Sequence, residues 1–329
     1  LLTGPSYIPP KWAFGYQQSR WSYKDKTEVL QVAKKFCELK IPCDAIYLDL
    51  DYMDNYKVFT VNEERFPDFK SFVTELKEMG FRLVPIIDPG VKVEEGYEVY
   101  EEGISKNFFC KTQKGENFTA AVWPGLTHFP DFLNSEVRKW WGQNYTKLTE
   151  LGIEGFWNDM NEPAIFYSKE KRDEAVQLMK AECSKPNTEV DLFKVKGKLN
   201  MLQNNRDDFE NIVHTADGEE VCHNDVHNLF GFNMTRAFAD EFETSDKRFL
   251  IFSRSSYAGA HRFSGMWTGD NSSCWEHLYM NIKKIQSLNL CGFSYSGADI
   301  GGFGNNTSEE LLIRWMPLRI FLPLFRTHS

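Results

Sequence analysis

The sequence predicts an α/β protein, and within that class a (β/α)8 barrel of the TIM type. Short apolar segments alternate with amphipathic helical segments along most of the 329 residues, which is typical of parallel strands joined by crossover helices. Several apolar segments end in acidic or amide residues, and barrel enzymes keep their polar chemistry at the carboxyl ends of the strands. The length also suits a barrel with insertions.

Seven short apolar segments are predicted as barrel strands. After them, residues 308–325 read as a helix, and the sequence shows no further strand. A barrel of eight strands does not close with seven, so we expect the eighth strand to lie beyond residue 329. On this interpretation the chain is a catalytic domain cut from a longer protein. The predicted strands are residues 15–20, 45–50, 83–87, 155–158, 249–253, 265–268 and 292–296.

Amphipathic helices are predicted between these strands. Residues 68–79 place Phe69, Phe72, Val73 and Leu76 on one helical face, and Gly80 ends the pattern. Residues 134–151 and 274–288 are further predicted helices.

Two long stretches interrupt this alternation. Residues 91–122 follow the third strand, and the charge-rich residues 164–230 follow the fourth. Structureless loops of this length are uncommon in compact domains, so we expect an inserted loop or subdomain at the first position and an inserted subdomain at the second.

Composition excludes some classes of partner. The net charge of −9 argues against nucleic acid and anionic membranes, and no stretch of about 18 apolar residues predicts a membrane span. The seven cysteines are odd in number and scattered, which favours free thiols in a reducing compartment, and we expect a cytoplasmic location. Whether copies of the chain form a homo-oligomer stays open.

The most informative segment is Gly-Phe-Trp-Asn-Asp-Met-Asn-Glu-Pro at residues 155–163. A buried strand that ends in carboxylates and amides indicates a site at that end, although a helix cap is the simpler reading of the same residues. Asp159 is the candidate nucleophile. Glu162 is its nearest competitor, and its alternative role is an acid at a helix N-terminus.

A second segment, residues 254–271, has the same pattern of an aromatic run followed by a carboxylate. It begins with Arg254 and ends with Trp267 and Asp270. Two strand-end acids beside tryptophans suit glycoside hydrolysis, in which one carboxylate attacks the anomeric carbon and the other protonates the leaving oxygen. Asp270 is the candidate acid/base.

These motifs closely resemble glycoside hydrolase family 31. The segment at 155–163 is similar to the family's nucleophile signature, and 254–271 is similar to its acid/base segment. The resemblance extends from Phe-Gly-Tyr-Gln-Gln-Ser-Arg-Trp at 14–21 to Phe-Arg-Thr-His at 325–328. It implies a barrel flanked by β-sandwich domains of the same parent chain, an oligosaccharide substrate, a covalent glycosyl intermediate and retention of configuration.

The resemblance also implies a set of sugar-binding residues. Arg254 and His328 correspond to family residues that contact the substrate, and Asp49 to one that binds hydroxyls at the nonreducing end. Asp51 favours glucose over xylose, because xylosidase members often carry an aromatic residue there. The full predicted substrate site is Trp21, Asp49, Ile86, Asp88, Trp123, Trp157, Met160, Arg254, Trp267, Asp299, Phe303 and His328.

The leading functional hypothesis is a retaining exo-acting α-glucosidase that acts on small α-1,6 or α-1,4 gluco-oligosaccharides. An α-xylosidase, an α-glucan lyase and a non-catalytic sugar-binding protein are the alternatives. No cofactor is expected. Cys222, His223 and His227 have a metal-like spacing, but no second Cys/His cluster completes four ligands, so no metal is expected.

Overall fold

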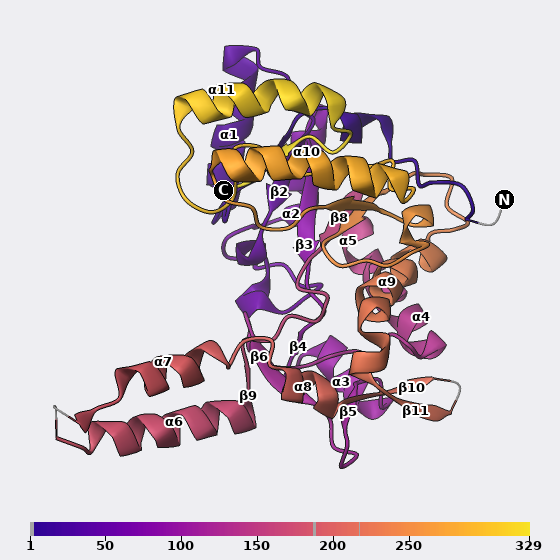
Figure 1. Ribbon diagram of the computed structural model, residues 1–329. Helices are drawn as coiled ribbons and strands as arrows, with labels where there is room; N and C mark the ends of the chain where they lie inside the picture. Colours follow the sequence, from indigo (N-terminus) through magenta and orange to yellow (C-terminus); the bar gives the residue numbers. More distant parts are fainter. Residues whose placement is uncertain (1–2, 187–188, 217) are drawn as a thin grey trace. The chain divides into compact units, whose positions relative to one another are not determined.

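The computed structural model describes residues 3–186, 189–216 and 218–329. These residues form two compact units (Figure 1). The first unit comprises residues 1–88, 138–161 and 231–329, and the second comprises 89–137 and 162–230. The predicted insertions at 91–122 and 164–230 fall among the residues of the second unit. Within the described residues, no helix combines the length and the hydrophobicity that crossing a bilayer requires.

The first unit contains a sheet of eight parallel strands that follow one another in chain order. Its central strands are buried on both faces, as expected when helices cover the outside of a barrel. The strands are β1 (Gln17–Gln18), β2 (Ala45–Leu48), β3 (Arg82–Ile87), β8 (Gly155–Asn158), β12 (Leu250–Ser253), β13 (Gly265–Trp267), β14 (Ser296–Gly297) and β15 (Arg326–Thr327).

The eighth strand lies inside the chain, so the expectation that it follows residue 329 is wrong. β15 pairs with β1 in parallel, with Gln17 opposite Arg326. A parallel bridge between Gly297 and Leu324 joins the neighbouring edge and closes the barrel. Two features hid this strand in the sequence: no apolar run marks its two residues, and one of them, Arg326, is charged. The barrel fold itself is as predicted.

Helices cover the outside of this barrel. Helix α2 shows why they form where they do: the Asp68 carboxylate accepts a hydrogen bond from Ser71 N at the helix start, and one face buries Phe69, Phe72, Val73 and Leu76. The helices are α1 (Lys26–Leu39), α2 (Phe69–Glu78), α4 (Ser135–Asn144), α5 (Thr146–Thr149), α9 (His223–Glu241), α10 (Trp275–Leu290) and α11 (Glu309–Leu318).

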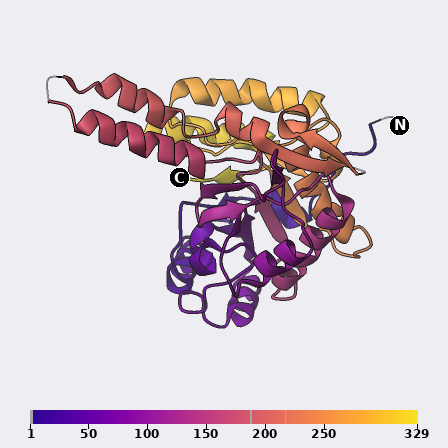
Figure 2. The ribbon, with the colours of Figure 1, turned by 90° about the horizontal axis from the view of Figure 1, so that it is seen from below.

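Helices α10 and α11 lie side by side at the C-terminal part of the barrel (Figures 1 and 2). A cluster of buried side chains, including Ile285 of α10 and Trp315 of α11, packs them against the segment that follows β14. By contrast, the connection from β12 to β13 contains only a short 3-10 helix, Ala260–Arg262. One α-helix of the regular alternation is therefore missing there.

The second unit contains two small antiparallel sheets. One joins β4 (Val91–Lys92), β7 (Gly125–His128), β6 (Thr119–Val122) and β9 (Tyr167–Ser168), and the other joins β11 (Glu219–Cys222), β10 (Ile212–Ala216) and β5 (Lys111–Thr112). Its helices are α3 (Glu98–Ser105), α6 (Lys169–Cys183), α7 (Leu192–Asn200) and α8 (Arg206–Asn211). Helices α6 and α7 form a hairpin (Figure 2).

Candidate active site

The predicted site residues follow the carboxyl ends of consecutive barrel strands. Asp49 follows β2, Asp88 follows β3, Asp159 follows β8, and Arg254 follows β12. Asp270 and Asp299 come shortly after β13 and β14, and His328 comes directly after β15. Since all these strands are parallel, the side chains gather at one end of the barrel.

Asp159 is held in place by two donors to the same carboxylate oxygen. Met160 N donates to Asp159 Oδ1 at 2.7 Å, and Arg254 Nη1 lies 2.8 Å from that oxygen. Met160 adopts a left-handed backbone conformation with φ of 55°, which turns the chain sharply after the strand. Arg254 Nη2 also contacts Met160 Sδ at 3.3 Å. The structure thus brings three predicted site residues together around one buried carboxylate.

Asp49 and His328 form a second group. His328 Nε2 lies 3.8 Å from Asp49 Oδ2, while His328 Nδ1 shares a hydrogen bond with Ser19 Oγ at 2.7 Å. Phe303 stacks on the His328 ring with centroids 4.7 Å apart and planes 9° apart. Burial, and then the positive charge of Arg326, lower the pKa of His328 well below its ordinary value. The ring is therefore neutral near pH 7.

Burial also governs Asp49. Loss of hydration raises the pKa of Asp49 to about 7, although its hydrogen bond from Leu50 N acts in the opposite direction. The negative charge of Asp159 raises it further. Near neutral pH, Asp49 can therefore be either a donor or an acceptor toward a bound hydroxyl.

Arg326 lies close to the site, and sequence reasoning missed it. Its Nη2 lies 2.6 Å from Asp299 Oδ1, and both side chains are fully buried. The guanidinium carbon lies 4.6 Å from the Trp157 ring centre and 5.2 Å from that of Trp267. Burial raises the pKa of Asp299 to about 6, against the opposing effect of Arg326. The ion pair accounts for the position of Asp299, whose contact with a sugar stays a prediction.

The predicted aromatic lining falls into two groups. Trp157 and Trp267 are buried and pack edge to face, with ring centres 5.7 Å apart. Trp21 and Trp123 are exposed. Trp123 belongs to the second unit, where it packs on Phe166. Their contacts with substrate stay predictions.

The remaining predicted residues differ in exposure. Ile86 and Asp88 are buried at the end of β3, whereas Asp270 is exposed in the turn after β13. Asp270 and Asp159 both act on Asp299 electrostatically, which places both acids near the same end of the barrel. Glu162, the competitor of Asp159, lies in a turn and not at the start of a helix.

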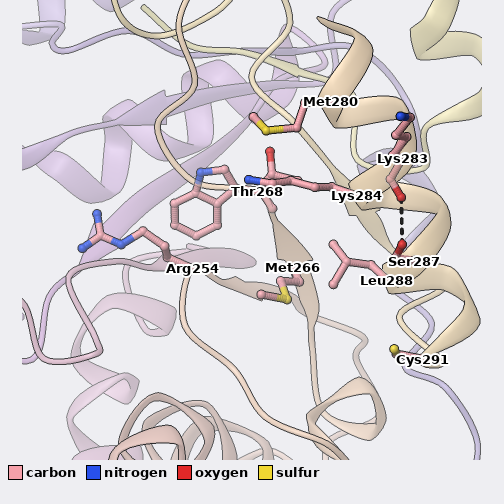
Figure 3. Close-up of a pocket in the computed structure, with 10 residues that line it drawn as sticks. Arg254, Met266, Thr268, Met280, Lys283, Lys284, Ser287, Leu288 and Cys291 are labelled. Atoms are coloured by element: carbon pink, nitrogen blue, oxygen red, sulfur yellow. Dashed lines mark hydrogen bonds between the residues drawn. The ribbon is translucent and has the colours of Figure 1, made fainter. Parts of the chain in front are cut away.

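A pocket of about 470 Å³ lies beside Arg254, between β13 and α10 (Figure 3). Met266, Met280, Leu288 and Cys291 give it a largely apolar lining. Among the described residues, neither Asp159 nor Asp270 lines it. Since the two proposed catalytic acids do not line this pocket, it is not assigned to the reacting sugar.

Known proteins resemble this chain over its whole length. It is 42% identical to alpha-glucosidase 2 of Bacillus thermoamyloliquefaciens, covering 99% of this chain and 37% of that protein. It is 34% identical to human neutral alpha-glucosidase AB, covering 100% of this chain and 31% of that protein. The chain thus spans about a third of the length of these relatives.

Solved structures give the same picture. The glucosidase II alpha subunit in its Glc1Man2-bound form superposes with a TM-score of 0.80 at 32% identity, covering 99% of this chain and 32% of that one. A dextranase of Flavobacterium johnsoniae with bound glucose superposes with a TM-score of 0.79 at 25% identity, covering 99% of this chain and 37% of that one. Residues 6–329 match the glycosyl hydrolases family 31 TIM-barrel domain. The chain therefore belongs to glycoside hydrolase family 31.

Proposed function

We propose that this chain is the catalytic domain of a retaining, exo-acting α-glucosidase. It would release glucose from the nonreducing end of small α-1,6 or α-1,4 gluco-oligosaccharides. The observation that carries this proposal is the Asp159 carboxylate, which Met160 N and Arg254 hold in one orientation at the end of a buried strand. Membership in a family whose similar members are named alpha-glucosidases supports it.

In the proposed reaction, an Asp159 carboxylate oxygen attacks the anomeric carbon as the Asp270 carboxyl gives its proton to the leaving glycosidic oxygen. A water molecule then attacks the anomeric carbon and gives a proton to the Asp270 carboxylate, and the bond to the Asp159 oxygen breaks. Glucose leaves with its original configuration, and both carboxyl groups return to their starting states. The exposure of Asp270 lets it exchange protons with solvent between turnovers.

The group formed by Asp49, His328 and Phe303 suits the terminal sugar. A neutral histidine and a carboxyl that titrates near pH 7 offer both donors and acceptors to hydroxyl groups, and the stacked rings fix the imidazole. Asp51 accepts a hydrogen bond from Ser22 Oγ and forms an ion pair with Arg65. These two contacts fix the orientation of its carboxylate. We propose that this acid favours glucose over xylose.

A proton NMR time course of the full-length protein with isomaltose, and separately with maltose, tests the proposal. Release of α-glucose before mutarotation is the expected result, and the two rates give the linkage preference. Release of β-glucose first would remove Asp159 from the nucleophile role. Anhydrofructose as product would indicate a lyase, and faster cleavage of an α-xyloside would indicate a xylosidase. Sugar binding without turnover of any of these substrates would support the alternative of a non-catalytic sugar-binding protein.

We also propose a reducing, cytoplasmic location. All seven cysteines lie within the described residues and are free, which is the usual state of thiols in the cytosol. Thiol titration of protein purified without reductant, then denatured in the presence of a chelator, should give all seven thiols; a lower count would support an oxidising compartment.

The greater length of the relatives supports flanking β domains in the parent protein, and mass measurement of that protein tests this.

A further inference from the structure

A buried cluster in the second unit takes no part in the proposed reaction. Cys110, Asp131 and His214 bring one ligand atom each to within 4.8 Å of one another. Cys110 Sγ lies 3.5 Å from His214 Nδ1, and Asp131 Oδ1 lies 2.8 Å from the same nitrogen. All three side chains are buried.

The backbone fixes these three positions independently. In the antiparallel pairing of β10 with β5, Ile212 lies opposite Thr112 and Val213 opposite Lys111, so the next pair in register is His214 and Cys110. On the other side of the cluster, Cys110 N donates to Phe129 O and Asp131 N donates to Phe108 O. The three side chains thus come from segments that hydrogen bonds hold in register, which is how rigid binding sites are built.

The outward atoms of two of these side chains already have partners. Thr215 N donates to Asp131 Oδ2 at 2.6 Å, and His214 Nε2 lies 2.9 Å from His223 Nδ1. His223 Nε2 in turn lies 2.9 Å from His227 Nδ1. Protein ligands of metal ions usually have such outer hydrogen bonds, which orient them and leave one atom facing the ion. Here the atoms that face one another are Cys110 Sγ, Asp131 Oδ1 and His214 Nδ1, and Leu133 N also donates to Asp131 Oδ1 at 3.3 Å.

We propose that Cys110, Asp131 and His214 form a binding site for a zinc ion. A thiolate, a carboxylate and an imidazole are the ligand types that zinc prefers. One thiolate and one carboxylate neutralise the ion, so the loaded site carries no net charge in its buried position. The Pro130 carbonyl oxygen lies 3.5 Å from Cys110 Sγ and is the candidate fourth ligand.

The separations agree with this assignment to within a small adjustment. Tetrahedral zinc with ordinary bond lengths separates a sulfur and a nitrogen ligand by about 3.5 Å, which is the distance between Cys110 and His214. The same geometry requires a distance of about 3.3 Å between Asp131 Oδ1 and His214 Nδ1. These atoms are 2.8 Å apart, so zinc binding must increase their distance by about 0.5 Å. Their contact is a hydrogen bond, which the ion would replace.

The proton balance is simple. Zinc binding removes the Cys110 thiol proton to solvent. If His214 starts with its proton on Nδ1, that proton leaves to solvent and each hydrogen bond of the histidine chain takes the opposite direction, so that His214 Nε2 donates to His223 Nδ1 and His223 Nε2 donates to His227 Nδ1. A solvent proton then completes His227 Nε2. The histidine chain neither gains nor loses a proton overall.

This assignment revises the sequence-based expectation that the chain holds no metal. That expectation weighed Cys222, His223 and His227. The structure instead assigns His223 and His227 to a supporting chain behind His214. Cys222 makes a different contact: its Sγ donates a hydrogen bond to Glu210 O at 3.6 Å.

Zinc and cobalt binding to tag-free, full-length protein test the proposal. After dialysis against a chelator, we expect one equivalent of Zn²⁺ to bind, and Co²⁺ in its place to give a sulfur-to-cobalt charge-transfer band. Cys110→Ser should abolish that band. His223→Gln, which alters the outer contact of His214 and changes none of the three proposed ligands, should weaken zinc binding about 10- to 100-fold. The matched control, Cys222→Ser, changes a cysteine of the same unit and should leave stoichiometry and band unchanged.

Two results would overturn the site. The first is a wild-type protein that binds no Zn²⁺ above the background of a metal-free protein standard; this measurement needs no variant and so does not depend on a variant folding. The second is a cobalt band that survives in Cys110→Ser. Glucosidase activity does not enter either readout, so failure of the zinc site and failure of the proposed function are separate outcomes.

Discussion

Asp159 is the residue on which the proposed chemistry depends most directly. Asp159→Asn keeps the shape of the side chain but removes the attacking carboxylate, so we expect kcat to fall by at least about 10⁴-fold. Glu162→Gln is the matched control, because it changes the other acid of the same motif, and its kcat should stay within about tenfold of the wild type. Steady-state kinetics on maltose and isomaltose measure both variants.

A smaller variant tests the nucleophile role more sharply. In Asp159→Ala, added azide can occupy the vacated space and attack the anomeric carbon from the same side, so activity should return with a β-glucosyl azide as product. An α-glucosyl azide, or a loss of activity confined to the Glu162 variant, would contradict the assignment of Asp159.

Arg254 acts at the same scale by holding Asp159. The guanidinium reaches Asp159 Oδ1 through one nitrogen and Met160 Sδ through another, a fork that lysine cannot reproduce. Arg254→Lys keeps the charge, and we expect kcat/KM to fall by about 10- to 1000-fold because 1 Å of misplacement costs about 10² in rate. Retention of wild-type kcat/KM in this variant would show that charge alone suffices.

The raised pKa of Asp49 predicts a dependence of stability on pH. The folded group titrates at about 7 and an unfolded aspartate at about 3.9, so the folded state holds the extra proton between these values. The free energy of unfolding must therefore fall as pH rises through this window. Asp49→Asn should remove about 2–3 kcal/mol of the fall between pH 5 and pH 8, measured by urea denaturation at these two pH values. The exposed Asp173→Asn should keep the wild-type dependence, and an unchanged Asp49→Asn would contradict the burial argument.

At the scale of elements, closure of the barrel depends on a close approach at Gly297. A Cβ at this position would lie 2.2 Å from Leu324 O, so a side chain cannot fit between β14 and the residues leading into β15. Gly297→Ala should lower the free energy of unfolding by about 1–3 kcal/mol, as overpacking usually does. Gly197→Ala is the control: it lies in α7 with open space around it, and should be neutral or stabilising by about 0.5–1 kcal/mol. Equal effects in chemical denaturation would show that the gap at Gly297 is not needed.

The elements also show what a sequence can reveal and what it hides. Strands β3 and β8 were predictable because apolar runs of ordinary length end in turn residues. Strand β15 was not, since its residues Arg326 and Thr327 are polar and no apolar run marks them. One signal was available: Pro317 and Pro323 both stand in the segment read as a helix, and proline disfavours helix in the residues before it. Helix α11 does end at Leu318, one residue after the first of these prolines.

At the scale of the whole barrel, only some residues of the site could be predicted from the sequence. Acids that end visible strands, such as Asp49 and Asp159, could be placed from the sequence. Arg326 could not, because its role comes from packing: its guanidinium is ringed by Tyr47, Trp157, Phe252 and Trp267, side chains from four different strands. No spacing in the sequence encodes that meeting of distant strands. The same packing gives Asp299 its buried ion-pair partner, which the sequence also did not reveal.

This buried pair makes a prediction for the whole barrel. Arg326→Met leaves the Asp299 carboxylate buried without its cation, and Asp299→Asn leaves the guanidinium without its anion, so each should lower the free energy of unfolding by about 3–5 kcal/mol. The double variant leaves neither charge unpaired, and should be more stable than the sum of the two losses predicts by about 1–3 kcal/mol. Equilibrium denaturation of the four proteins gives this coupling. The exposed pair Arg236 and Asp240 supplies a control cycle, where about 0.5 kcal/mol or less is expected. Strict additivity at Asp299 and Arg326 would mean that the strands meeting there are held by the aromatic rings alone.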